Sequence, residues 1–205
     1  MLTIKNQLEK VGMLNQPELR ENLQRVAKLY ASAHSDREKL VELEVQQRLK
    51  AVTNQGMAII QEMKQATKQD TLFQIVVTSV QMALKSDRVM LVRFVDETQV
   101  HVIAEMAGYG TPNLRDKVLP AGCFGRNQRE DYLGVSLLAV ADIYETQLPT
   151  YQRHFLERLQ MGASLVLPVV VGGESWGMLA VMSGEARRWH EVEMNLLQQV
   201  GSELC

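Results

Sequence analysis

The chain has 205 residues, of which 46% are hydrophobic and 22% are charged, so it can bury one good core and carry an additional segment. Its net charge is −2, and its 22 Lys and Arg residues are scattered among 24 acids, so we expect neither nucleic acid nor an anionic membrane as a partner. No apolar run approaches the length of a membrane span and no signal-peptide core is visible, so we expect a soluble, cytoplasmic protein.

Three helical runs are expected at the N-terminus. Residues 1–15 are mildly amphipathic, and a second run opens at Pro17. Ser35-Asp36 has the pattern of an N-cap and predicts the start of a third, long helix. We expect residues 1–50 to form a helical or coiled-coil extension and residues 51–205 to form a separate domain.

The third helix carries an apolar stripe at alternating steps of four and three residues. Its members are Val45, Leu49, Val52, Gly56, Ile59, Met63 and Ala66, the pattern of a coiled-coil seam. Two interpretations stay open, because the stripe can pack on its own domain or pair the helices of two chains. Its apolar surface exceeds what the flank of one small domain usually exposes, which predicts a homodimer through helices.

A further helix, an antiparallel hairpin and an irregular segment are predicted after this long helix. Asp70-Thr71 predicts the N-cap of another helix. Residues 89–94 and 100–104 alternate in polarity or are apolar, and they predict an antiparallel hairpin. Residues 107–131 are rich in Gly and Pro and predict a long irregular segment, of the kind that usually covers a pocket in a compact domain.

The C-terminal third predicts one short helix and a second hairpin. Residues 149–159 begin with Pro149, whose fixed φ suits a first helical turn, and place apolar residues at helical spacing. Residues 165–171 and 175–182 are continuously apolar and are joined by a short Gly-Gly turn. Because this turn is too short for a crossover, the two runs are predicted to form adjacent antiparallel strands at the centre of a sheet.

Several motifs resemble the GAF domains of phytochromes and cyanobacteriochromes. An ungapped match runs through Asp142-Ile143-Tyr144, Leu148, Leu156-Glu157-Arg158, Gln160, Ala163, Leu165-Val166, Pro168 and Trp176-Gly177, and the likeness extends to Asp87-Arg88-Val89, Arg93-Phe94, Cys123-Phe124, Tyr132 and Arg188-Trp189. The resemblance covers roughly residues 57 to 205. It implies an α/β (α+β) fold, the GAF fold, with a central antiparallel sheet flanked by helices and an N-terminal helical extension.

The resemblance also implies where a bilin pocket would lie. The family's Cys-His pair, in which Cys forms the thioether to the chromophore, corresponds to Tyr151 and Gln152. The Asp of the family's Asp-x-Cys-Phe motif corresponds to Ala121, while Cys123 and Phe124 remain. The usual covalent anchor is therefore replaced.

Two further pocket positions differ from the family. The Arg that holds a propionate corresponds to Ser136, and the His on the last strand corresponds to Met182. Burying the polar groups of a tetrapyrrole unpaired costs on the order of 1 to 3 kcal/mol each, so no cofactor is expected. Asp142, before Tyr144, is either a site acid or an acceptor of hydrogen bonds at a strand-to-helix junction.

Alternatives for the pocket stay open. The former pocket is either partly core, or it holds another apolar ligand or an unusual bilin through Cys123 or without a covalent bond.

Catalytic chemistry has little support in the sequence. The four histidines are isolated from one another, and Cys123 and Cys205 lie far apart without a ligand partner at metal-binding spacing. A GAF-fold reductase of methionine sulfoxide would need a resolving partner for Cys123. We therefore expect a non-catalytic signalling or regulatory module that acts through dimerisation or a protein partner, the alternative being a sensor of a bilin or another flat ligand.

Overall fold

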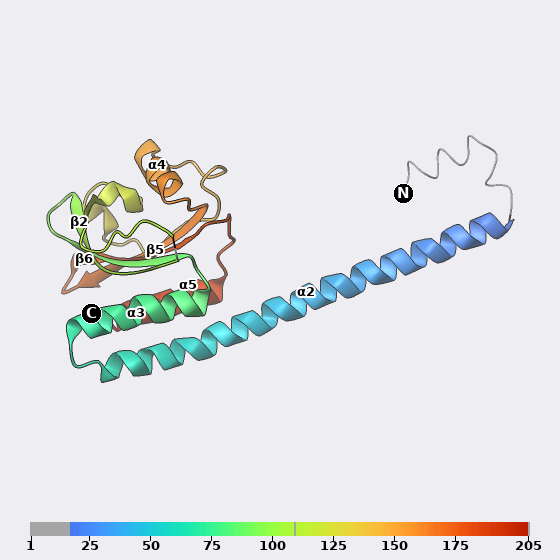
Figure 1. The fold of residues 1–205 in the computed structure, drawn as a ribbon, viewed down its shortest axis with the longest axis horizontal. Helices are drawn as coiled ribbons and strands as arrows, with labels where there is room; N and C mark the ends of the chain where they lie inside the picture. The colour runs from blue at the N-terminus through green and yellow to red at the C-terminus, as the bar shows by residue number, and fades with distance from the viewer. Residues whose placement is uncertain (1–16, 109, 205) are drawn as a thin grey trace. The chain divides into compact units, whose positions relative to one another are not determined.

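The computed structural model describes residues 17–108 and 110–204, so the expected helix at residues 1–15 lies outside the described residues. Helix α2, Pro17–Gln65, is the first described element (Figure 1). The chain divides into two compact units, of which one ends at Arg48 and the other begins at Leu49. The first unit consists, in its described part, of α2 residues 17–48.

The expected helix start at Ser35-Asp36 is wrong, because α2 continues through both residues. An N-cap requires backbone outside the helical region, and only strong helix breakers impose that within a helical run. No Gly or Pro lies between residues 18 and 55, and Ala31 and Ala33 favour helix. Asp36 is accommodated with its side chain exposed on the helix surface.

The C-terminal part of α2 packs within the second unit. Val52, Ile59 and Met63 are buried in a core cluster that also includes residues of α3, Gln69–Leu84, and α5, Glu191–Ser202. At Gly56 an added Cβ would lie 3.0 Å from Leu196 Cδ1 of α5, so the glycine allows close helix contact. For these residues the structure shows the first of the two interpretations, in which the stripe packs on its own domain.

The expected cap at Asp70-Thr71 is displaced. Helix α3 begins at Gln69, after Lys68 in an extended conformation without a side-chain capping bond. Asp70 lies in the first turn, where its charge favours the positive end of the helix dipole.

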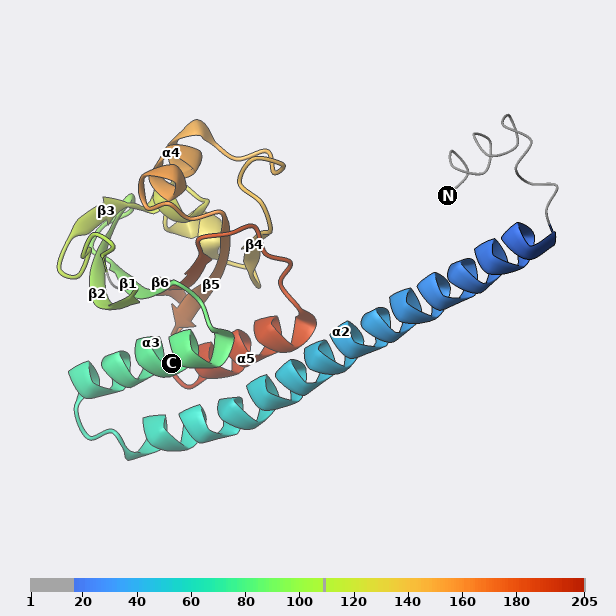
Figure 2. The same cartoon turned by 45° about the vertical axis from the view of Figure 1, so that its right-hand side comes forward.

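A six-stranded antiparallel sheet forms the centre of the second unit, with the strand order β3-β2-β1-β6-β5-β4 (Figure 2). The strands are β1 Arg88–Phe94, β2 Gln99–Ala107, β3 Val118–Pro120, β4 Leu138–Val140, β5 Ala163–Val171 and β6 Glu174–Ser183. The predicted hairpins β1–β2 and β5–β6 are both present, and Gly172 and Gly173 have the positive φ that the second turn requires. The predicted α+β GAF fold is confirmed.

The two faces of the sheet bury different residues, because successive side chains of a strand point to opposite sides. Val89 and Leu91 of β1 lie in the cluster with α2, α3 and α5. Met90, Val92 and Phe94 lie in a second cluster on the other face, where α4, Thr150–Arg158, is found (Figure 1).

The segment predicted as irregular, residues 107–131, contributes to this second face. It contains β3 and the 3₁₀ helix η2, Ala121–Phe124, and the 3₁₀ helix η3 spans Glu130–Tyr132 at its end.

Among the residues that the structure describes, none of the helices combines the length and apolar character that a membrane crossing needs.

Candidate functional site

The face of the sheet that carries α4 and η2 holds most of the predicted pocket residues. We call its buried hydrophobic residues the pocket-face cluster: Met90, Val92, Phe94, Val100, Val102, Ala121, Cys123, Phe124, Tyr132, Val140, Ile143, Leu156, Leu159, Met161, Val166, Met178, Ala180 and Met182. Cys123, Phe124 and Met182 are each at most 2% exposed. These three predicted site residues are thus packed against other side chains of the chain.

The η2 turn is held in place by Tyr132. The Tyr132 hydroxyl lies 3.0 Å from the Ala121 carbonyl and 3.1 Å from the Arg126 carbonyl, and it accepts a hydrogen bond from the Arg126 N–H at 3.0 Å. Phe124 packs its ring at 5.7 Å, centroid to centroid, against Phe155 of α4. The turn therefore presents Cys123 and Phe124 inward.

Helix α4 closes over this turn with the residues that replace the family's Cys-His pair. Tyr151 lies near η2, where its hydroxyl influences the pKa of the Cys123 thiol, although about half of the Tyr151 side chain remains exposed. Gln152 is buried beside Gly125, where an added Cβ would lie 3.4 Å from Gln152 Nε2. Gly125 has a φ of +113°, and an added Cβ would also lie only 3.1 Å from Leu138 Cδ1, so both its conformation and this close contact favour glycine.

Burial raises the pKa of the Cys123 thiol to about 11, while the Tyr151 hydroxyl and the charge of Arg158 lower it by less. Near neutral pH the thiol is therefore protonated. Because the folded state holds this proton more tightly than the unfolded state, the thiol's contribution to stability is lost as pH rises above the unfolded pKa.

Cys123 is expected to react slowly with iodoacetamide at pH 8 in the folded protein, with a rate that continues to rise with pH toward about 11. In a Cys205→Ser background the Tyr151→Phe variant should react still more slowly, because it loses a hydroxyl that favours the thiolate. Alkylation followed by mass spectrometry measures both rates. A folded-state rate at pH 8 equal to that of the urea-unfolded chain would contradict this assignment.

Besides Tyr151 and Gln152 of α4, three predicted site residues are not part of the pocket-face cluster. Ser136 and Tyr144 are exposed, Tyr144 to 71%. Asp142 is half-buried and accepts a hydrogen bond from the Tyr144 N–H at 2.8 Å, so it acts as the acceptor at a turn before α4, the second role expected for it.

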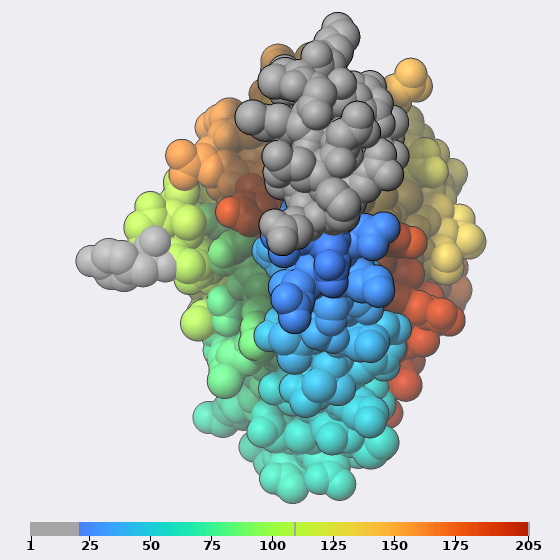
Figure 3. All heavy atoms as spheres, turned by 90° about the vertical axis from the view of Figure 1, so that its right-hand side faces the viewer, coloured from blue at the N-terminus to red at the C-terminus, as the bar shows by residue number. Residues whose placement is uncertain are grey.

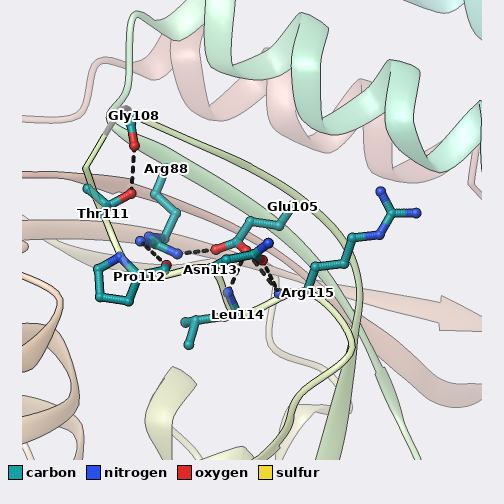
Figure 4. Close-up of polar contacts among 8 residues, drawn as sticks. All are labelled: Arg88, Glu105, Gly108, Thr111, Pro112, Asn113, Leu114 and Arg115. Carbon is teal, nitrogen blue, oxygen red and sulfur yellow. Dashed lines mark hydrogen bonds and ion pairs between the residues drawn. The ribbon is translucent and has the colours of Figure 1, made fainter.

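The sequence analysis did not predict a buried ion pair that lies at the N-terminal end of β1 (Figure 4). Arg88 is fully buried, pairs with Glu105 of β2, and donates to the Pro112 carbonyl at 2.9 Å. The other oxygen of Glu105 accepts hydrogen bonds from the Leu114 and Arg115 N–H groups at 2.7 and 2.9 Å. The signal available in the sequence was a charged residue within each of two apolar or alternating strands.

The hydrogen bonds of this ion pair hold the loop after β2 against the sheet. A hollow of about 480 Å³ borders it, lined by Gln74, Glu105, Met106, Ala107, Gly108, Thr111, Asn113 and Arg115. Both oxygens of Glu105 are already occupied, and the Arg115 guanidinium donates to Gln74 at 3.2 Å. The Glu105 carboxylate is thus fully used in holding Arg88 and the loop, and of the Arg88 guanidinium only Nε lacks a hydrogen-bond partner, so the arrangement is structural.

A second buried ion pair joins helices and sheet. Arg187 pairs with Glu193 of α5, donates to the Leu84 carbonyl of α3 at 2.7 Å and stacks over the Trp189 ring at 4.6 Å. The Trp189 indole N–H donates to the Val140 carbonyl of β4 at 3.1 Å. These contacts connect the start of α5 to helix α3 and to strand β4.

No candidate metal site is present in residues 17–108 and 110–204, because no group of three or more His, Cys, Asp or Glu residues there is placed to hold an ion.

Comparison with known proteins shows the family and the relatives that this chain is similar to. The family model described as the GAF domain matches residues 69–204. A Synechocystis protein named as a methyl-accepting chemotaxis protein is 29% identical over 136 residues, which are 66% of this chain and 14% of that protein. The Synechocystis circadian input-output histidine kinase CikA is 26% identical over 171 residues, covering 72% of this chain and 23% of the kinase. The chain thus spans a minor part of the length of both.

Solved structures show the same fold. The blue-light-absorbing form of the Thermosynechococcus elongatus PixJ GAF domain has a TM-score of 0.60 and 26% identity, over 68% of this chain and 88% of that one. The phycocyanobilin-bound GAF domain of a cyanobacterial phytochrome has a TM-score of 0.64 and 21% identity, over 76% and 91%. With the family match covering most of the residues and the structural neighbours being phytochrome and cyanobacteriochrome domains, the chain belongs to the GAF domain family.

Proposed function

We propose that this chain is a non-catalytic regulatory GAF module whose former bilin pocket is filled by its own side chains, and that it acts through self-association of its helices or through a protein partner. Residues 51–205 are the module in this proposal, and residues 1–50 are an extension that serves association. The observation that carries it is the packing of Cys123, Phe124 and Met182 into one buried cluster beneath α4. The signalling roles in the names of two curated relatives support it.

The side chains on α4 favour a module without a covalent pigment. Tyr151 stands where the resemblance places the nucleophile, and a phenol with an ordinary pKa near 10 is a poor substitute for a thiol. Gln152 is buried and uncharged, and Ala121 offers no carboxylate to the pyrrole N–H groups. Met182 likewise offers no polar partner on β6.

The second candidate function is a sensor that binds a bilin or another flat ligand. Cys123 favours it, since the thiol of the family's Asp-x-Cys-Phe motif is retained, and one structural neighbour is a phycocyanobilin-bound GAF domain. The raised pKa of Cys123 opposes it, because the thiolate is the reacting species. The same raised pKa supports the non-catalytic assignment.

Co-expression with enzymes of bilin synthesis tests the proposal. The wild-type protein is expected to remain colourless, whereas Tyr151→Cys with Gln152→His is expected to gain a zinc-stained band on a denaturing gel, because it restores a thiol and an imidazole on α4. The matched control is the same double variant with Cys123→Ala, which should keep the band. A wild-type band that disappears in Cys123→Ala would replace the proposal with the sensor function.

A further inference from the structure

An apolar stripe is exposed on α2 before Arg48. Val26, Leu29, Leu40 and Leu43 are between 55% and 66% exposed, and Ala33 and Asp36 between them are exposed as well. The segment is drawn as blue to cyan spheres in Figure 3. Helices in proteins gain most of their stability from packing an apolar face, and this face has no such packing among the described residues.

The spacing of these six residues is that of a coiled-coil seam. The steps from Val26 to Leu43 are three, four, three, four and three, so the residues form one stripe about 26 Å long at 1.5 Å per residue. The stripe is distinct from Val52, Ile59 and Met63, which are buried in the second unit. It therefore remains available to another helix.

The spacing of the seam positions is the same when it is counted from either end of the segment. Reversing the seam about its midpoint, between His34 and Ser35, places Val26 opposite Leu43, Leu29 opposite Leu40 and Ala33 opposite Asp36. In a parallel, in-register pair Asp36 would instead face the Asp36 of the other copy, and like charges placed directly opposite are destabilising. The antiparallel arrangement removes this clash and opposes the small Ala33 to Asp36.

The exposed charges on the same segment favour the same direction. Arg25 and Lys28 lie near one end of the seam, and Glu42 and Glu44 lie near the other, all exposed. Antiparallel pairing of two copies brings the basic end of each beside the acidic end of its partner. Complementary potentials of this kind fix orientation more than they add affinity.

We infer that α2 residues 26–43 form an antiparallel, two-fold symmetric contact with the same residues of a second copy of this chain. The inference rests on the proposed function, since it names the partner and the surface for the self-association proposed there. It replaces residues 45–66 as the contact, because the C-terminal part of that stripe is buried within its own domain.

Sedimentation equilibrium of the full chain tests the surface. The wild type is expected to be a dimer at tens of micromolar, and Leu29→Glu with Leu40→Glu is expected to weaken it by more than tenfold. The matched control is Met57→Glu with Met82→Glu, which replaces two residues that are each 65% exposed outside the seam and adds the same charge. The control should dimerise like the wild type. A monomeric wild type, or equal weakening in both variants, would overturn the inference.

Disulfide trapping in a Cys205→Ser background tests the direction. A mixture of Leu29→Cys and Leu40→Cys chains should give the mixed disulfide, and neither variant alone should cross-link. Efficient cross-linking of Leu29→Cys alone would overturn the antiparallel register. A dimer that survives Leu29→Glu with Leu40→Glu would overturn the inference and leave self-association standing, while the bilin experiment judges the filled pocket separately.

Discussion

Replacing Glu105 with alanine is expected to lower the free energy of unfolding by about 3–5 kcal/mol, because it leaves the buried Arg88 charge without its partner. The same change also removes the acceptor for the Leu114 and Arg115 N–H groups, so the loop after β2 loses its attachment. Urea unfolding followed by circular dichroism measures the change. A loss this large is a substantial part of the stability of an ordinary domain.

Two comparisons separate the burial of the charge from the loss of an ion pair as such. Glu174→Gln removes the partner of Arg129 in an exposed pair, 2.9 Å apart, and should cost less than about 1 kcal/mol. Arg88→Met with Glu105→Leu removes both buried charges and should recover much of the stability lost in Glu105→Ala. If the double variant were no more stable than Glu105→Ala, the uncompensated charge would not be the cause.

Phe124→Ala is expected to cost about 3–5 kcal/mol, because the ring is fully buried and its removal leaves a cavity in the pocket-face cluster. The ring contact with Phe155 of α4 is lost as well. The cost should be the same whether or not a bilin is supplied during expression. Chemical unfolding of protein from both preparations is the measurement.

The matched control for this change is Tyr144→Ala. Tyr144 is also an aromatic residue assigned to the pocket by resemblance, yet it is 71% exposed, so its replacement should change stability by less than about 0.5 kcal/mol. An open ligand cleft in place of packed core would make Phe124→Ala nearly as mild as Tyr144→Ala. That outcome would refute the filled pocket.

Local pattern was sufficient for the strands around the second hairpin. Two apolar runs and a Gly-Gly turn specify an antiparallel pair, and the structure places β5 and β6 beside each other at the predicted residues. The helix boundary at Ser35 failed for the converse reason. A cap motif is a weak local preference, and the helix-forming residues on both sides outweighed it.

Contacts between distant segments were beyond sequence reasoning. Arg88 and Glu105 are 17 residues apart, and their pairing depends on the β1–β2 register and on the loop that covers them. The resemblance named Cys123 and Tyr151 as pocket positions, but the influence of Tyr151 on the Cys123 thiol depends on how α4 lies over η2. The exposure of Tyr144 likewise depends on the turn that Asp142 forms.

The central claim is that the pocket-face cluster fills the position of a bilin pocket with the protein's own side chains. Mass spectrometry of the wild-type protein, purified from cells supplied with a bilin, tests this claim most directly. The account predicts a mass of 23.2 kDa per chain under native and denaturing conditions alike, with no visible absorption band. An added tetrapyrrole mass under native conditions, accompanied by an absorption band, would contradict it, and retention of that mass after denaturation would identify a covalent pigment.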